Sequence, residues 1–219
     1  MSTSLRWTLA VVVLLAVLGV AMATELRDRD TPPAADSAVP VAREHRDADT
    51  PEALAGPRKK ADLPPCPAAR GAAGPESLRG VVVECAADGS AVDVASAFAD
   101  RAVVLNLWAY WCAPCAQELP AMADYQRRAG DAVTVVTVHQ DENETAALLR
   151  MAELGVRLPV LQDGRRSIAA ALGVPNVMPA TVVLRRDGSV ATVLPQPFTD
   201  ADQITAAVSA ALGDTGARR

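Results

Sequence analysis

The sequence has few aromatic residues and no basic stripe, and the lack of a basic stripe excludes a class of functions. Phe, Tyr and Trp make up 3% of the 219 residues, and the net charge is −5 at pH 7. A nucleic-acid-binding protein carries a basic stripe that neutralises phosphates, and this chain has none. We therefore expect no nucleic-acid partner. Half of the residues are hydrophobic, which suits one ordinary domain with extensions.

Cysteine is also scarce, and its spacing argues against a zinc site. Cys112 and Cys115 stand two residues apart in NLWAYWCAPCAQELP, whereas Cys66 and Cys85 are far apart and do not supply a second closely spaced pair. A purely structural disulfide across so short a loop would gain little from chain entropy. The close pair is therefore predicted to carry redox chemistry, and no metal is expected.

An almost unbroken apolar run covers residues 7–23. It is either an uncleaved signal anchor or a cleaved signal peptide with the small-x-small site Ala21-Met22-Ala23. Both interpretations place the rest of the chain outside the cytoplasm. We favour the anchor for residues 1–24. The expected location is the cell membrane, single-pass, with an extracytoplasmic domain, and the alternative is a secreted protein.

The next segment, residues 25–65, mixes Pro, Ala, Asp, Glu and Arg without helical or strand periodicity. Such a composition buries too little apolar surface to offset chain entropy, so we predict a disordered linker. Residues 66–213 are expected to form the domain, and residues 214–219 a disordered tail.

Within the domain, apolar runs alternate with helical patterns. Buried strands are predicted at 102–109 and 132–139, helices at 113–129 and from an Asn143 cap to Leu154, a hairpin turning at Asp187-Gly188 within 180–194, and a last helix capped by Thr199. The first half favours a parallel unit and the second an antiparallel one. The fold class is α/β with a mixed sheet.

These features resemble the TlpA/ResA-like family of extracytoplasmic thiol-disulfide oxidoreductases, which have the thioredoxin fold. The resemblance lies in WCAPC between a strand and a helix, Pro120 five residues after Cys115, and VMPAT at 177–181 before the hairpin. It covers about residues 74–212. It implies a mixed central sheet flanked by helices and an enzyme that exchanges disulfides with proteins, without a cofactor.

The residues themselves support separate roles for the two cysteines. Cys112 is expected at a helix N-terminus, where backbone N–H groups and the helix dipole favour a thiolate. Cys115 lies one turn further, shielded, where it can resolve a mixed disulfide. We expect Cys112 to attack and Cys115 to resolve.

Glu118 is the third predicted catalytic residue, and it shares a helix face with Cys115. ResA-like proteins have a glutamate at this place, which implies that Glu118 relays the proton of Cys115; a solvated surface glutamate is the alternative. Cytoplasmic thioredoxins have a buried aspartate where this chain has Asn106. That departure strengthens the case for Glu118.

A partner protein is expected to contact Trp111, Ala113, Pro114, Met178 and Pro179. Trp111 would cover one side of the disulfide. The resemblance implies a cis Met178–Pro179 bond whose backbone faces Cys112 and pairs with the partner.

The direction of exchange is open. The resemblance favours a reductase of apocytochrome c or its maturation factors, served by a membrane thiol reductant. A disulfide oxidase or isomerase, served by an oxidant, is the alternative, although the uncharged Ala113-Pro114 favours a reducing potential. A non-enzymatic alternative is a copper carrier that uses Cys112, Cys115 and His139.

Cys66 and Cys85 have a separate interpretation. A bond between them would close a loop of about 20 residues and stabilise the fold by about 3 kcal/mol. We predict a structural disulfide. A second redox pair and free thiols are the alternatives.

Overall fold

The computed structural model describes residues 49–71 and 74–213. Its helices are α2 (Pro51–Ala61), α3 (Val94–Ala97), α4 (Ala113–Ala129), α5 (Glu144–Leu154), α6 (Ser167–Ala171) and α7 (Ala201–Leu212), with short 3₁₀ turns at Glu76–Leu78 and Gly130–Ala132. Its strands are β1 (Val82–Cys85), β2 (Ala91–Asp93), β3 (Val103–Trp108), β4 (Thr134–His139), β5 (Val160–Gln162), β6 (Ala180–Leu184) and β7 (Val190–Leu194).

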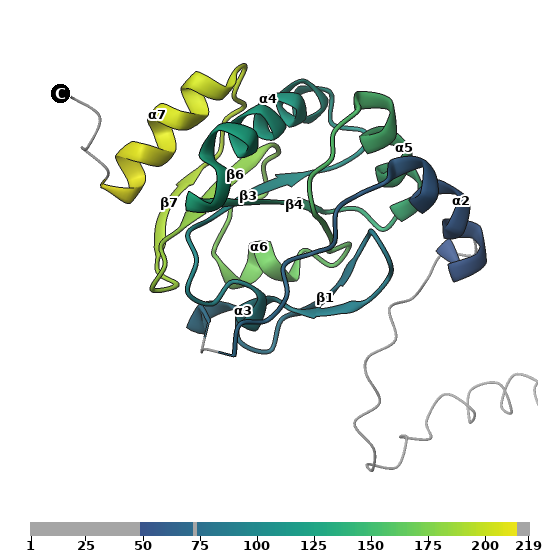
Figure 1. The fold of residues 1–219 in the computed structure, drawn as a ribbon, viewed down its shortest axis with the longest axis horizontal. Helices are drawn as coiled ribbons and strands as arrows, with labels where there is room; N and C mark the ends of the chain where they lie inside the picture. Colours follow the sequence, from purple (N-terminus) through teal and green to yellow (C-terminus); the bar gives the residue numbers. More distant parts are fainter. Residues whose placement is uncertain (1–48, 72–73, 214–219) are drawn as a thin grey trace, which may run out of the picture. The chain divides into compact units, whose positions relative to one another are not determined.

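All seven strands of the described part form one sheet in the order β2-β1-β5-β4-β3-β6-β7. The pairs β3–β4 and β4–β5 are parallel, whereas β6, β7, β1 and β2 join through antiparallel pairs. The predicted mixed sheet is therefore confirmed. The parallel centre places the ends of β3 and β4 side by side, next to the start of α4 (Figure 1).

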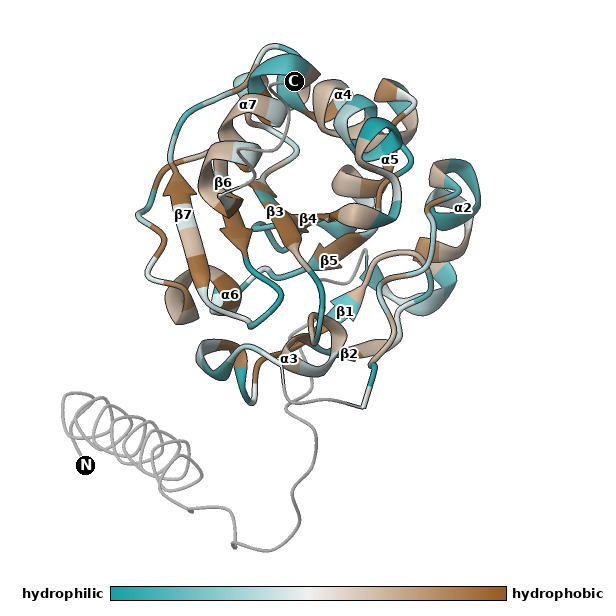
Figure 2. Cartoon of the chain, turned by 60° about the vertical axis from the view of Figure 1, so that its left-hand side comes forward, coloured by the Kyte–Doolittle hydropathy of each residue, from teal (hydrophilic) through white to brown (hydrophobic). Residues whose placement is uncertain are grey.

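The sheet separates two apolar layers. One layer packs α2, α4, α5 and α7 on the face that carries Val104, Trp108 and Val135. The other packs α3 and α6 on the face that carries Leu105 and Val136. The central strands are mostly hydrophobic, while the helices carry both hydrophobic and hydrophilic residues (Figure 2). This pattern follows from burial of the central strands on both faces.

The helix that follows the CxxC motif has the predicted bounds. Cys112 is its N-cap, Pro114 lies in its first turn, and Gly130 follows its last residue. Proline suits the first turn because its missing N–H would have no partner there. The cap of α5 is also as predicted, since Asn143 accepts a hydrogen bond from Ala146 N–H. The last helix differs by one residue, because Asp200, not Thr199, is its N-cap.

The predicted disordered linker is wrong for its C-terminal part. Residues Pro51–Ala61 form α2, which packs against α5 and buries Leu54 and Ala61. Thr50 caps the helix through a hydrogen bond from Ala53 N–H. The ordered domain therefore begins before residue 66, because a weakly amphipathic helix is stabilised here by tertiary packing.

Two charged residues hold this N-terminal segment in place. Asp49 is 1% exposed and accepts hydrogen bonds from the N–H groups of Glu144 and Thr145 at the start of α5. Arg58 makes an ion pair of 3.0 Å with Glu144 and donates to the carbonyl oxygen of Ala86. These contacts cannot be read from local composition, because the partners are distant in the sequence.

No helix among residues 49–71 and 74–213 is long and apolar enough to span a membrane. The predicted signal anchor at 1–24, the linker at 25–48 and the tail at 214–219 lie outside the described residues.

Candidate active site

The CxxC motif forms the first turn of α4. Strand β3 ends at Trp108, and a short loop leads to Cys112 at the helix N-cap. Cys112 and Cys115 form a disulfide with an S–S distance of 2.02 Å. The backbone N–H of Cys115 donates to Cys112 Sγ at 3.3 Å. The structure thus places Cys112 at the positive end of the helix dipole, where a thiolate is favoured after reduction.

The two cysteines differ in their access to solvent. Cys112 is 5% exposed and Cys115 is 0% exposed. Around Cys112, the side chains of Trp111, Ala113 and Pro114 are exposed, and that of Trp111 by 56%. A partner can therefore reach Cys112 but not Cys115, which is the asymmetry that the attacking and resolving roles require.

Glu118 lies one turn after Cys115, on the same face of α4. It is fully buried, not a solvated surface glutamate. Its Oε2 accepts a hydrogen bond from Asn106 Nδ2 at 2.6 Å, and its Oε1 accepts one from Phe198 N–H at 3.0 Å. Burial raises the pKa of Glu118 to about 7, although these two hydrogen bonds act in the opposite direction. A carboxyl group with such a pKa can accept and return a proton near neutral pH.

Asn106, noted in the sequence as a departure, is part of this site. Its side chain comes from the middle of β3 and is fully buried, so its amide reaches the Glu118 carboxylate from the sheet. The amide stabilises the charged form of Glu118 without adding a second charge. Asn106 therefore supports Glu118 by donating a hydrogen bond to its carboxylate.

The loop before Cys112 is fixed by a second set of hydrogen bonds. Trp111 Nε1–H donates to Asp141 Oδ2 at 3.0 Å, and Asp141 Oδ1 accepts from Asn143 N–H at 2.9 Å. Arg150 Nε donates to the carbonyl oxygen of Tyr110 at 3.3 Å. The indole is therefore tied to the loop that leads into α5.

His139, the histidine of the copper alternative, lies at the end of β4 and is fully buried. Its Nε2 accepts a hydrogen bond from Tyr110 N–H at 3.4 Å, so Nδ1 carries the proton and donates to Gln162 Oε1 at 2.8 Å. Burial lowers the pKa of His139 to about 4, which keeps the ring neutral. Both ring nitrogens are thus used in structural hydrogen bonds, which argues against a ligand role.

Two further expectations concern the loop before β6. The Met178–Pro179 peptide bond is cis. Pro179 is buried, whereas Met178 is half-buried and the preceding Val177 is 40% exposed. Their role in partner binding stays a prediction.

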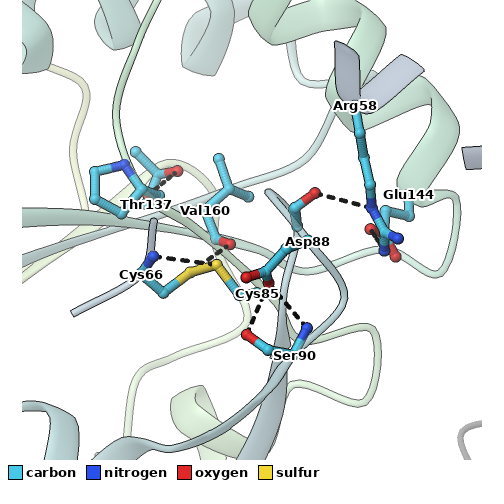
Figure 3. Close-up of a disulfide and its surroundings, with 10 residues drawn as sticks. Arg58, Cys66, Cys85, Asp88, Ser90, Thr137, Glu144 and Val160 are labelled. Atoms are coloured by element: carbon cyan, nitrogen blue, oxygen red, sulfur yellow. Dashed lines mark hydrogen bonds and ion pairs between the residues drawn. A yellow bond between two sulfur atoms is a disulfide. The ribbon is translucent and has the colours of Figure 1, made fainter. Parts of the chain in front are cut away.

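Cys66 and Cys85 form the second disulfide, and Figure 3 shows its surroundings. Cys85 is the last residue of β1 and is 1% exposed, while Cys66 lies in the extended chain five residues after the end of α2. The backbone N–H of Cys66 donates to Cys85 Sγ at 3.2 Å, and Cys66 Sγ lies 3.4 Å from the carbonyl oxygen of Val160 (Figure 3). The bond fastens the N-terminal segment to the sheet.

Sequence reasoning missed three contributors to the site. The N–H of Phe198 is a backbone group, so no sequence pattern marks it. Asp141 could have been suspected only as a polar residue just after a buried strand. Thr181, fully buried on β6, is the register partner of Asn106, which becomes visible only when the sheet is assembled.

Comparison with known proteins agrees with this geometry. The family model described as Redoxin matches residues 65–210. Thiol-disulfide oxidoreductase ResA of Bacillus subtilis (strain 168) is 33% identical over 101 residues, which are 46% of this chain and 56% of that protein. The chain thus spans only about half the length of this curated relative.

Solved structures show the same fold. A DsbF homologue from Corynebacterium diphtheriae has a TM-score of 0.53 and 27% identity, over 64% of this chain and 88% of that one. A secreted thiol-disulfide isomerase from Corynebacterium glutamicum also has a TM-score of 0.53, with 26% identity over 61% and 84% of the two chains.

Proposed function

The chain belongs to the Redoxin family, and we propose that it is a thiol-disulfide oxidoreductase that reduces disulfides of protein partners through Cys112 and Cys115. One observation carries this proposal. The Cys112–Cys115 disulfide lies at the N-terminus of α4, where Cys112 is the more exposed of the two cysteines and the buried Glu118 lies one turn after Cys115.

The reaction begins with the reduced enzyme. The Cys112 thiolate attacks a sulfur of the partner disulfide, so a mixed disulfide forms and one partner sulfur leaves as a thiolate. Cys115 then attacks Cys112 Sγ and releases the second partner sulfur. The partner has gained two electrons, and Cys112 and Cys115 are oxidised. A membrane dithiol reductant restores them.

Glu118 serves the second step. Cys115 is buried and attacks only as a thiolate, so its proton needs an acceptor within the protein. The Glu118 carboxylate takes this proton, and its pKa of about 7 lets it do so at neutral pH. It returns the proton when the disulfide is reduced again.

The reducing direction is supported by the surroundings of Cys112. The residues between the cysteines, Ala113 and Pro114, carry no charge, and one backbone N–H, that of Cys115, contacts Cys112 Sγ. The thiolate is therefore stabilised only modestly, as suits a reductant. Cytochrome c maturation is the process that we propose, with apocytochrome c or its maturation factors as partners.

The second candidate is a disulfide isomerase or oxidase. The similarity to the secreted thiol-disulfide isomerase from Corynebacterium glutamicum favours this function. The same cysteines would act, but the partner disulfide would be rearranged or formed. For either function we propose an extracytoplasmic location, with residues 7–23 as the membrane anchor or as a cleaved signal peptide.

The test is a trapping experiment in cells with the full chain. Cys115→Ser leaves the attacking thiol without its resolving partner, so covalent adducts that reductant releases are expected to accumulate. Cys112→Ser is the matched control and yields none. If Cys115→Ser yields no adducts while the wild type remains functional, the exchange mechanism is wrong.

The midpoint potential of the Cys112–Cys115 pair decides the direction. A value near roughly −270 mV supports the reductase, and one near roughly −120 mV supports an oxidase.

A further inference from the structure

A row of three polar side chains lies buried across the sheet. Asn106 of β3 is the register partner of Thr181 on β6 and of Thr137 on β4. All three are fully buried. Directly paired residues share one face of a sheet, with Cβ atoms about 4.5–5.5 Å apart. Since Asn106 bonds to Glu118, the row faces α4.

The members of this row differ in their hydrogen bonds. Thr137 Oγ1 donates to the carbonyl oxygen of Pro159 at 3.2 Å. Asn106 gives its Nδ2–H to Glu118, but Asn106 Oδ1 and Thr181 Oγ1 have no hydrogen-bond partner among residues 49–71 and 74–213. Buried polar atoms are nearly always paired. The two atoms do not hydrogen-bond to each other in the structure, but they belong to register partners and are chemically suited, because an amide oxygen accepts and a hydroxyl can donate or accept.

The proton that Glu118 takes up changes what its neighbours must offer. The ionised carboxylate accepts from both Asn106 Nδ2–H and Phe198 N–H. A protonated carboxyl has an O–H that needs an acceptor, and on Oε2 this O–H would meet the amide donor of Asn106. Rotation of the Asn106 amide by half a turn exchanges Nδ2 and Oδ1 and supplies the acceptor.

We propose that Asn106 is a two-position amide switch that follows the protonation of Glu118, with Thr181 as the partner for both positions. With Glu118 ionised, Asn106 Nδ2–H donates to Oε2, and the Thr181 side chain rotates so that its hydroxyl donates to Asn106 Oδ1. With Glu118 protonated, the carboxyl O–H donates to Oδ1 and Nδ2–H donates to Thr181 Oγ1.

The protons balance without a further group. The Cys115 thiol gives its proton to the Glu118 carboxylate and becomes the attacking thiolate, while the amide gains and loses none. Asn106 is therefore a positioning residue. An ionised aspartate at 106 could not replace it, because a carboxylate only accepts hydrogen bonds. This role rests on the proposed function of Glu118 as the proton acceptor.

The other groups that titrate around α4 do not compete with this switch. Cys112 and Cys115 lie on the same helix, and His139 of β4 is buried and neutral. β3, β4 and β6 contribute the uncharged row, and α7 contributes buried apolar side chains. Except for Arg58–Glu144, which joins α5 to α2, the ion pairs formed by α4 and by the neighbouring helix α5 lie at the surface: Arg127–Asp124, Arg128–Asp202 and Arg150–Glu153.

The test uses NMR on the oxidised full chain, in which the disulfide keeps both cysteines from titrating. The ¹³C signal of the Glu118 carboxyl gives its midpoint. The side-chain ¹⁵N–¹H signals of Asn106 are expected to shift with the same midpoint. If they stay unchanged while Glu118 titrates, the switch is wrong.

Two threonine variants separate the switch from a packing effect. Thr181→Val leaves the amide without its second partner, and an unpaired buried N–H is rarer in folded proteins than an unpaired carbonyl oxygen. The protonated state therefore suffers more, and the midpoint is expected to fall by roughly half a unit or more. Thr137→Val, in the same row, is expected to leave the Glu118 midpoint unchanged. Thr181→Ser, which retains the hydroxyl, is expected to keep the wild-type midpoint. Equal effects of the two valine variants would overturn the proposal.

The outcome does not depend on any partner protein. If trapping by Cys115→Ser fails but the NMR signals of Asn106 and Glu118 move together, the switch stands and the proposed function falls. If trapping succeeds and the signals do not move together, the opposite holds.

Discussion

The two disulfides of this protein are the same covalent bond in two different settings. In each, one sulfur accepts a backbone N–H: Cys112 Sγ at 3.3 Å and Cys85 Sγ at 3.2 Å. Cys112 is flanked by exposed residues, and its partner Cys115 has the buried Glu118 one helical turn away, whereas Cys85 is buried at the end of a strand. The comparison teaches that the neighbours, rather than the bond, separate a site of exchange from an anchor.

The lengths of the loops that the two disulfides close support the same distinction. Cys112 and Cys115 are separated by 3 positions, and Cys66 and Cys85 by 19. The longer loop restricts the unfolded chain more, so its disulfide contributes more to stability. It also fastens a segment that α2, Asp49 and Arg58 already attach to α5.

The largest expected effect comes from removing each bond in turn. Cys112→Ala with Cys115→Ala abolishes disulfide exchange and changes stability little. Cys66→Ala with Cys85→Ala keeps exchange but lowers the free energy of unfolding by about 3 kcal/mol. An insulin-reduction assay and denaturant unfolding measure the two quantities. Loss of exchange in the second variant, with its fold intact, would instead make Cys66 and Cys85 a second redox pair.

The next effect concerns Glu118, the buried carboxyl group near the Cys112–Cys115 disulfide. The folded protein keeps a proton on Glu118 between its ordinary pKa of 4.5 and about 7, while the unfolded chain has released it. The free energy of unfolding therefore falls as the pH rises through this window. Glu118→Gln resembles the protonated form and removes that fall. Relative to the wild type, the variant should gain up to about 3 kcal/mol between pH 5 and pH 8.

The same variant should lose activity where the wild type gains it. The rate of mixed-disulfide resolution is expected to rise through pH 7 in the wild type, because ionised Glu118 is the proton acceptor, and to lose this rise in Glu118→Gln. Glu76→Gln, an exposed site with an 87% exposed side chain, is the matched control. A wild-type pH profile that survives Glu118→Gln would assign proton transfer to another group.

The smallest effect tests how the anchored segment is held. Arg58 pairs with the fully buried Glu144 at 3.0 Å, whereas Arg157 pairs with the exposed Asp62 at 3.5 Å. Arg58→Gln is expected to lower the free energy of unfolding by about 2 kcal/mol, and Arg157→Gln by less than about 1 kcal/mol. Chemical denaturation measures both. Equal losses would mean that the buried Arg58–Glu144 pair stabilises the segment no more than a surface pair does.

The position of the redox cysteines could be predicted because it depends on local signals. β3 and α4 are predicted by local signals: a strand of Val and Leu, a proline in the first helical turn and a glycine after the last. Cys112 at the N-cap and Cys115 one turn inside follow from that register. Even Glu118 could be placed on the right face of the helix, because helical spacing is regular.

Other features depended on residues that are far apart in sequence. α2 looked like part of a linker because its own apolar surface is small, and it is stable only against α5. The high pKa of Glu118 requires its burial in the folded protein, and the Asn106–Thr181 pair requires the antiparallel register of β3 and β6. The sequence by itself determined the helix that presents Cys112, because short-range backbone preferences suffice for that. Only the tertiary structure decided which groups surround the buried carboxyl, because burial and cross-strand contact arise when distant segments pack together.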